Sequence, residues 1–273
     1  MRITKGHWFA IIGILLGCGV VVLAVFLIMR RYKADHPPLD AVINITAKQP
    51  TADIERPKAG TKLTTLRSTV GDDVLFNSTS SSAAIMQDIT DKNGDTIPTI
   101  MANSTTFKGP AGLAQTMGQN LTVFLLTRVP KNGTNSTDVT GYNATNASNT
   151  ARLAAYQYSG NLLIDRGSIG NNVFNYDNPP FNGSTIGLFV WRMNGANLSA
   201  WYGPLLTKDG SAISPGVSVT GGTAVDLTNG DLTFLSSHEV HNMCQLVVYN
   251  RALNDTEIAT VIKYLQNEWP GAS

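Results

Sequence analysis

The first hydrophobic run of the chain is also its longest, and it is entirely uncharged. It covers the 22 residues 8–29 (WFAIIGILLGCGVVVLAVFLIM). A helix of this length spans roughly 33 Å, against about 30 Å of bilayer hydrocarbon. We therefore expect a retained transmembrane helix over residues 8–29, after an amino-terminal tail over residues 1–7. The residues expected to form this membrane anchor include Trp8, Phe9, Ile14, Val21, Phe26, Met29, Arg30 and Arg31.

Two alternatives compete with the anchor. A cleaved signal peptide has an apolar region of about 7–15 residues followed by small residues, whereas this run is longer and ends in Met29, Arg30 and Arg31. A buried helix of a soluble domain is the other alternative. Basic residues flank the run on both sides, so charge does not predict its orientation in the membrane.

The pattern changes after the run. Residues 30–63 contain four prolines (Pro37, Pro38, Pro50 and Pro57) and little apolar periodicity. This composition predicts an extended stalk between the membrane and the next domain. An irregular arm packed along that domain is an equally good interpretation.

Short β-type runs fill the rest of the chain. Residues 121–129 are apolar on both faces, which is typical of a central strand, and residues 186–193 and 243–249 repeat the pattern. An Asn194-Gly195 turn between residues 186–193 and 197–203 predicts a hairpin. Weaker strand candidates are residues 73–76, 151–158, 161–165, 169–174, 216–220 and 232–235. Many short strands predict an all-β, two-sheet sandwich or jelly roll over residues 64–273.

One amphipathic helix is expected at the carboxyl end. Asn254 and Glu257 have the spacing of a capping box, and Pro270 with Gly271 stops the helix. The apolar stripe comprises Ile258, Val261, Ile262, Leu265 and Trp269. We expect this stripe to pack on the sandwich, so that a charge at Ile262 would prevent soluble expression.

Composition excludes several classes of protein. Hydrophobic residues make up 42% of the chain, which excludes global disorder, and the formal net charge is +1. Five basic residues lie within the first 33 positions, so the remainder is mildly acidic and no nucleic-acid partner is expected. Two cysteines, Cys18 and Cys244, exclude a disulfide scaffold and a multi-cysteine zinc site.

The carboxyl-terminal residues 245–269 (QLVVYNRALNDTEIATVIKYLQNEW) resemble the closing strand and helix of laminin-G-like domains of the concanavalin A-like lectin/glucanase superfamily. Residues 89–95, 120–129 and 186–203 agree more loosely. The resemblance implies a jelly roll of roughly a dozen strands that binds glycans, proteins or calcium, or is structural. In two departures, Gln245 replaces a glutamate and a tryptophan near position 89 is absent.

No catalytic residue is expected. Glucanases of this superfamily carry a Glu-x-Asp-x-Glu strand, and retaining glycosidases need two carboxylates about 5–5.5 Å apart. The chain has only four glutamates, Glu55, Glu239, Glu257 and Glu268, and none lies in that pattern. We therefore predict a protein that is not an enzyme and has no cofactor, apart from a calcium ion.

The calcium candidate is a loop with Asp88, Asp91, Asn93 and Asp95. Calcium prefers several converging carboxylate and carbonyl oxygens, which these residues could supply. The loop lacks the EF-hand pattern, and a turn stabilised by Asx hydrogen bonds explains it equally well.

The best candidate for ligand binding is the loop over residues 171–183 (NNVFNYDNPPFNG), where asparagines alternate with aromatics. Aromatic faces stack on sugars and asparagine amides bind hydroxyl groups, but the aromatics could equally anchor the loop itself. The candidate binding residues are Asn171, Asn172, Phe174, Tyr176, Asn178 and Phe181.

The chain also contains eleven Asn-x-Ser/Thr sequons, more than chance predicts, which suggests an extracellular or luminal domain. The asparagine cluster over residues 132–149 is expected to be a flexible polar loop.

Three functions fit these patterns. A jelly roll on a membrane stalk is similar in style to minor capsid proteins of large DNA viruses, which link a protein shell to an internal bilayer; this is the favoured prediction. The second is a surface lectin that binds glycans, and the third, disfavoured, is an anchored glycoside hydrolase. The expected location is a single-pass position, either at the capsid–membrane interface of a virion or at a cell surface.

Overall fold

A computed structural model describes residues 40–51, 55–70, 74–79, 83–91, 94–102, 105–128, 139–158, 161–168, 172–176, 186–204, 218–234 and 241–270. The chain divides into two compact units, Met1–Leu39 and Asp40–Ser273, and the described residues all belong to the second. Among them no helix is long and apolar enough to cross a bilayer. The transmembrane helix over residues 8–29 lies outside the described part and stays a prediction.

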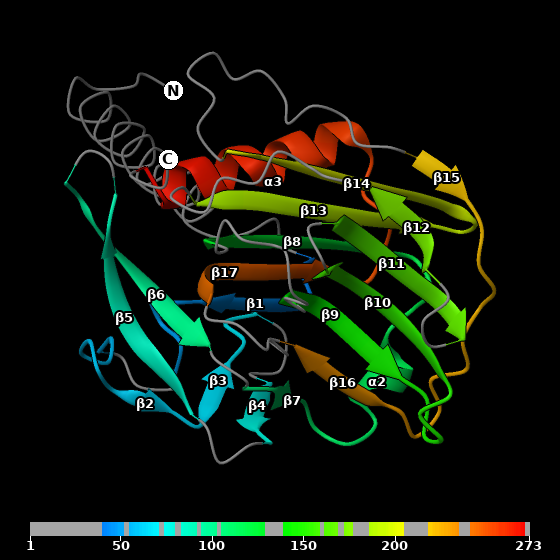
Figure 1. Ribbon diagram of the computed structural model, residues 1–273, viewed down its shortest axis with the longest axis horizontal. Helices are drawn as coiled ribbons and strands as arrows, with labels where there is room; N and C mark the ends of the chain where they lie inside the picture. The colour runs from blue at the N-terminus through cyan, green and yellow to red at the C-terminus, as the bar shows by residue number, and fades with distance from the viewer. Residues whose placement is uncertain are drawn as a thin grey trace, which may run out of the picture. The chain divides into compact units, whose positions relative to one another are not determined.

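Two antiparallel sheets form the second unit (Figure 1). The described strands of the first sheet follow the order β15 (Ser218–Thr220), β14 (Asn197–Pro204), β13 (Gly187–Asn194), β8 (Leu121–Arg128), β17 (His241–Tyr249), β6 (Thr96–Ala102), β5 (Ala84–Thr90) and β2 (Lys62–Leu63), with β1 (Ile43–Thr46) paired to β17. Those of the second follow the order β12 (Asn172–Tyr176), β11 (Asn161–Ser168), β10 (Ala151–Tyr158), β9 (Val139–Thr145), β16 (Asp231–Phe234), β7 (Phe107–Lys108), β4 (Leu75–Ser78) and β3 (Thr65–Arg67). The helices are α2 (Leu113–Thr116) and α3 (Asp255–Glu268). This confirms the all-β, two-sheet jelly roll with a carboxyl-terminal helix.

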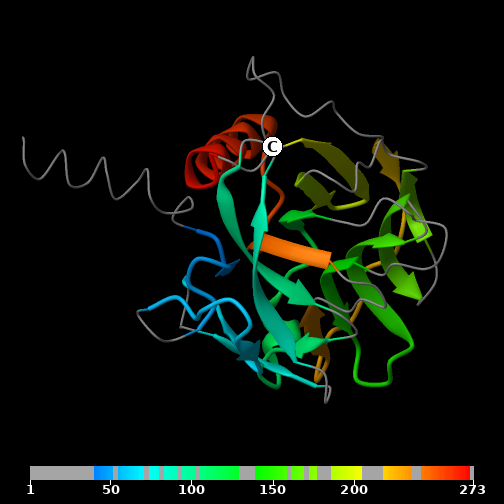
Figure 2. The same cartoon turned by 60° about the vertical axis from the view of Figure 1, so that its left-hand side comes forward.

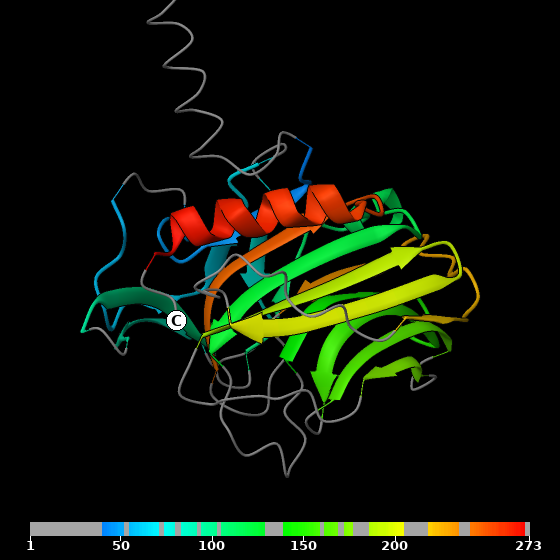
Figure 3. The ribbon, with the colours of Figure 1, turned by 90° about the horizontal axis from the view of Figure 1, so that it is seen from above.

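Strand β8 is central, as its sequence predicts. It pairs with β13 on one side and β17 on the other, and seven of its eight residues are buried. Both faces are covered because the second sheet packs on one and α3 lies along the other (Figure 3). A strand covered on both faces needs apolar residues at nearly every position.

The predicted β13–β14 hairpin is confirmed, with a small correction to its turn. Asn194 pairs with Asn197, so the two loop residues are Gly195 and Ala196 rather than Asn194 and Gly195. Gly195 takes a positive φ of 56°, which glycine adopts without steric cost. Its backbone N–H donates to Asn120 Oδ1 at 2.6 Å, which joins the turn to the start of β8.

Large aromatic side chains fill the core between the sheets. Phe76 and Phe234 meet edge to face with ring centroids 4.5 Å apart, and Phe189 and Trp191 stack on β13. Trp191 is fully buried, as expected.

Helix α3 has the expected start and apolar stripe. The Asn254 side chain accepts from the Glu257 N–H while Glu257 accepts from the Asn254 N–H, so the capping box is confirmed. Ile258, Val261, Leu265 and Trp269 are buried, whereas Ile262 is only partly buried. The buried face of α3 is therefore centred on Val261, and Ile262 lies at its edge.

The stalk predicted over residues 30–63 is wrong for its second half. Residues 43–46 form β1, which pairs along β17, and Ile43 and Ile45 are almost fully buried. Burying these two side chains gives the segment a stable place in the sheet despite the nearby prolines. The compact unit therefore begins at Asp40 rather than at residue 64.

The polar loop predicted over residues 132–149 is also corrected, because residues 139–145 form β9 between β10 and β16. Its inward side chains are small or aromatic, with Tyr142 and Ala144 buried. The sequence also gave no strand signal for β5 and β6, whose hairpin comes forward in Figure 2.

Candidate functional site

A polar pocket of about 380 Å³ lies between the end of the β13–β14 hairpin and the start of α3. Strand residues form one wall and the segment leading into α3 forms the other. Its lining residues are Arg192, Asn194, Asn197, Ser199, Ala252, Leu253, Asn254 and Asp255. The volume falls within the range of about 300–1,000 Å³ that is usual for small-ligand pockets.

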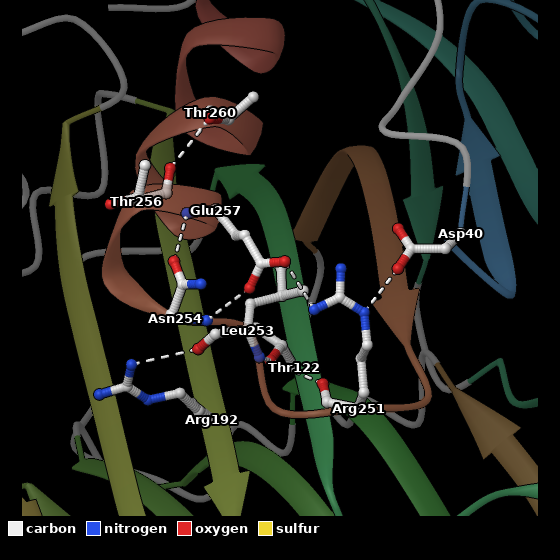
Figure 4. Close-up of polar contacts among 9 residues, drawn as sticks. All are labelled: Asp40, Thr122, Arg192, Arg251, Leu253, Asn254, Thr256, Glu257 and Thr260. Carbon is white, nitrogen blue, oxygen red and sulfur yellow. Dashed lines mark hydrogen bonds and ion pairs between the residues drawn. The ribbon is translucent and has the colours of Figure 1, made fainter.

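Arg192 links the two walls. Its Nη1 donates to the Leu253 carbonyl at 3.2 Å (Figure 4). The same Nη1 donates to Asp255 Oδ1 at 2.6 Å. Its guanidinium carbon also lies 4.9 Å from the ring centroid of Trp201 on the neighbouring strand, a cation–π distance. Because Asp255 is 87% exposed, this ion pair fixes geometry more than it adds stability.

Thr122 of β8 holds the segment that forms the helix-side wall. Its hydroxyl donates to the Arg251 carbonyl at 3.0 Å and accepts from the Leu253 N–H at 2.9 Å. Thr122 is fully buried, so both hydrogen bonds are shielded from water. The route of residues 251–253 across the sheet is therefore fixed by one strand residue.

The capping box orders the wall beyond Leu253 (Figure 4). Asn254 Oδ1 accepts from the Glu257 N–H at 2.9 Å, and Glu257 Oε2 accepts from the Asn254 N–H at 2.8 Å. The hydrogen bond from the Asn254 backbone, with a second from Arg251, lowers the pKa of Glu257 below its usual value. The carboxylate therefore stays charged at neutral pH and holds the first turn of the helix.

Arg251 connects this network to the start of the compact unit. Its Nε donates to Asp40 Oδ2 at 2.5 Å and its Nη1 lies 2.8 Å from Glu257 Oε1. The hydrogen bond with Asp40 is the main cause that raises the pKa of Arg251. Arg251 thus ties Asp40 to the first turn of α3.

The pocket presents donors and an acceptor to a ligand. The Oδ1 atoms of Asn197 and Asn254 are occupied, by Thr220 Oγ1 and by the Glu257 N–H, but within the described residues no acceptor binds their Nδ2 groups. Asp255 supplies an exposed carboxylate. Among the described lining residues it is the only carboxylate.

None of the predicted binding residues 171–183 is among the described residues that line this pocket. Asn172, Phe174 and Tyr176 lie in β12, which pairs with β11 in the second sheet, so this part is a strand rather than a loop. Asn171, Asn178 and Phe181 lie outside the described residues. Binding at 171–183 stays a prediction.

The residues of the calcium candidate have structural roles where they are described. Asp88 pairs with Arg56, and Asp91 Oδ1 accepts from the Asp95 N–H at 2.7 Å across the turn between β5 and β6. No three His, Cys, Asp or Glu side chains of the described chain come together as a metal site would require. Asn93 lies outside that part, so calcium binding stays a prediction.

Asparagines of the described sequons also have structural roles. Asn44 is buried and donates to Thr69, and Asn143 and Asn146 donate to Thr233 and Thr150. Because the Asn44 amide is buried, it cannot carry a glycan without disrupting its surroundings. At Asn143 and Asn146 glycosylation stays a prediction.

A second polar cluster lies on the outer face of the second sheet. Arg152 pairs with fully buried Asp165 and places its guanidinium carbon 4.6 Å from the ring centroid of Tyr156. Burial raises the pKa of Tyr156 to about 12, against the opposing effect of Arg152. The ion pair and the ring contact hold Arg152 in place, so the cluster contributes to the structure of this face.

The pocket was not found from the sequence, although one signal was available. Arg192 is the only charged residue in the apolar run 186–193. A charge in a central strand needs a partner, which here comes from the segment 253–255, about 60 residues further along the chain.

Solved structures resemble this fold at low sequence identity. The binding domain of botulinum neurotoxin DC in complex with SialylT matches with a TM-score of 0.52 and 11% identity over 83% of this chain and 51% of that chain. The botulinum neurotoxin serotype D/C VPI 5993 binding domain matches with a TM-score of 0.53 and 10% identity over 83% and 52%. A structure described as "Cell entry of botulinum neurotoxin type C is dependent upon interaction with two ganglioside molecules" matches with a TM-score of 0.53 and 10% identity, over 83% of this chain and 51% of that chain.

This chain therefore spans about half the length of the toxin chains that it matches. No protein-family model matches the sequence, and no curated protein matches it significantly. At about 10% identity the resemblance establishes a shared two-sheet jelly roll.

Proposed function

We propose that the domain is a glycan-binding module and that the pocket between the β13–β14 hairpin and α3 holds the sugar. One observation carries the proposal: Asn197, Asn254 and Asp255 line one cavity, and none of the described residues accepts a hydrogen bond from either asparagine Nδ2 group. Sugar hydroxyls both donate and accept hydrogen bonds, so they match amide donors and a carboxylate acceptor.

The solved structures support this class of function. One toxin binding domain is described in complex with SialylT, and for botulinum neurotoxin type C cell entry is described as dependent upon interaction with two ganglioside molecules. Those descriptions concern other proteins that share only the fold. The assignment of a glycan to this chain rests on the lining of its own pocket.

The link between a protein shell and a bilayer, which the sequence analysis favoured, stays a prediction. The residues that would form its anchor, 8–29, lie outside the described part of the chain. A glycan-binding domain on such an anchor would act at a membrane surface, so the two ideas are compatible.

The test is glycan-array binding by the full chain, followed by titration of the best ligand. The decisive variants are Asn254→Asp and Asn197→Asp, because each keeps the oxygen that accepts the structural hydrogen bond and removes the amide donor. Asp caps helices as well as Asn does, so Asn254→Asp should fold normally. We expect each variant to bind about tenfold or more weakly, the loss expected from one hydrogen bond.

The matched control is Asn267→Asp, the same chemical change at an exposed position of α3. It should bind like the parent chain. The proposal is wrong if no glycan binds, or if the three variants bind equally.

A further inference from the structure

Arg166 lies in β11 at the point where pairing with β12 ends, since the last pair joins Asp165 and Asn172. On the other side of β11 it is opposite Leu153 of β10. Leu153 belongs to the main core, and directly opposed residues of paired strands share a face. The Arg166 side chain therefore faces the space between the two sheets, where the residue is only 6% exposed.

The charge of Arg166 has no counterion within the described part of the chain. Its Nε and Nη1 atoms are buried and make no hydrogen bond. The nearest acidic residue in sequence, Asp165, lies on the opposite face of the sheet and pairs with Arg152. Asp226, beyond the loop that packs on Arg166, uses Oδ1 to accept from the Thr228 N–H at 2.9 Å.

The loop around Gly222 packs closely against the aliphatic part of Arg166. A Cβ added to Gly222 would lie 2.9 Å from Arg166 Cβ and 3.1 Å from its Cγ and Cδ. Gly222 has a φ of +82°, a conformation that other residues rarely adopt. The fit holds the stem of the arginine in place and so fixes the direction of its guanidinium.

A buried cation without a partner is unfavourable. Burial lowers the pKa of Arg166, but a guanidinium remains protonated in proteins and cannot escape the cost by losing its proton. An apolar side chain of similar volume would fill the same space more favourably. The arrangement becomes favourable when an anion accepts hydrogen bonds from Nε and Nη1.

We propose that Arg166 is the anion-binding residue of a second ligand site, at the edge of the sandwich where β11 extends past β12. The ligand group is an oxyanion, that is, a carboxylate, sulfate or phosphate group. The site is separate from the pocket beside α3, because it rests on the second sheet and on the loop around Gly222. Either site can therefore fail its test without affecting the other.

The test compares thermal unfolding of the full chain in chloride, acetate, sulfate and phosphate at matched ionic strength and pH. A bound anion raises the unfolding midpoint by roughly 2–4 °C once its concentration exceeds about five times its Kd. Sulfate and phosphate also stabilise proteins without a site, so the response must be compared with Arg166→Met. The three anions distinguish a carboxylate site from a sulfate or phosphate site.

We expect at least one anion to give a saturable rise in the parent chain and none in Arg166→Met. In chloride, Arg166→Met should unfold at the same temperature as the parent or higher, because it removes an unpaired buried charge. Arg192→Met, which changes only the pocket beside α3, should keep the full response to the anion.

Equal responses of the parent and Arg166→Met would overturn the proposal, since the stabilisation would then be a general salt effect. A clear loss of stability of Arg166→Met in chloride would overturn it too, because the guanidinium would then serve the fold itself. If Arg166→Met does not fold, Arg166→Lys is tested instead. This variant should fold, and it should need a higher anion concentration for the same rise in unfolding midpoint. An unchanged dependence on anion concentration would contradict the site.

Discussion

The indole Nε1 of Trp269 donates a 2.7 Å hydrogen bond to Oε1 of Gln245, and both side chains are almost fully buried. The Nε2 of the same amide donates to Asn44 Oδ1 at 2.7 Å and to the Tyr264 hydroxyl at 3.2 Å. The Gln245 side chain therefore joins its own strand, β17, to Asn44 of β1, to Tyr264 of α3 and to Trp269 directly after α3. It must both donate and accept, which a glutamate carboxylate cannot do, so this position has a structural reason for glutamine.

The first prediction is that Gln245→Glu lowers the free energy of unfolding by about 2–4 kcal/mol, because it buries a charge and removes two donated hydrogen bonds. Urea unfolding of the full chain measures this. Asn267→Asp also replaces an amide with a carboxylate, but at an exposed position of α3, and should lower the free energy of unfolding by less than about 1 kcal/mol. Similar losses for the two variants would show that the buried amide is not required.

A second prediction concerns the face of α3. Val261 is fully buried, so Val261→Asp should prevent the chain from folding or leave it insoluble. Ile262 is partly buried, so Ile262→Asp should remain soluble with reduced stability, a milder effect than the sequence alone predicts. Soluble yield and unfolding midpoint measure both, and a greater loss at Ile262 would contradict the packing described.

The capping box gives a third prediction. Asn254→Ala removes the acceptor for the Glu257 N–H and should lower stability by about 1 kcal/mol. Lys263→Ala, at an exposed position within α3, is the matched control and should change stability by less than about 0.5 kcal/mol. If Asn254→Ala is as stable as the control, the cap does not stabilise the helix.

The fourth prediction concerns the thiol of Cys244, which is fully buried and whose pKa is raised by burial. In a Cys18→Ser background, Cys244 should react with a thiol reagent only after denaturation. In the unfolded chain the thiol has a pKa of about 8.5, whereas in the folded chain it stays protonated to higher pH. Above that pKa the free energy of unfolding should therefore fall by up to about 1.4 kcal/mol per pH unit. Rapid labelling of the native chain at pH 8 would contradict the burial.

Local patterns in the sequence were enough to predict several elements. The strand β8, the β13–β14 hairpin and the capping box of α3 each follow from residues that are neighbours in the chain, because hydrophobic period and turn chemistry are local signals. Strand β9 was missed because its polar asparagines and threonines resemble a loop. Only its pairing with β10 and β16 makes it a strand.

The candidate sites depend on residues far apart in the sequence. Arg192 meets Asp255 and Leu253 across the face of a sheet, and Arg166 meets the loop of Gly222 between two sheets. In the sequence these arginines lie within β-type segments, with no indication of which distant residues surround them. The predicted binding residues 171–183 were chosen by composition, which cannot say which segments fold next to one another.

The sequence by itself determined that this chain builds a two-sheet β domain closed by a capped amphipathic helix, because alternation of apolar residues and helix capping act within a few residues. The tertiary structure alone decided that residues 43–46 complete the first sheet, that Gln245 joins three elements, and where two arginines are placed. Those features depend on burial and on hydrogen bonds between distant segments, which exist only once the sheets have packed together.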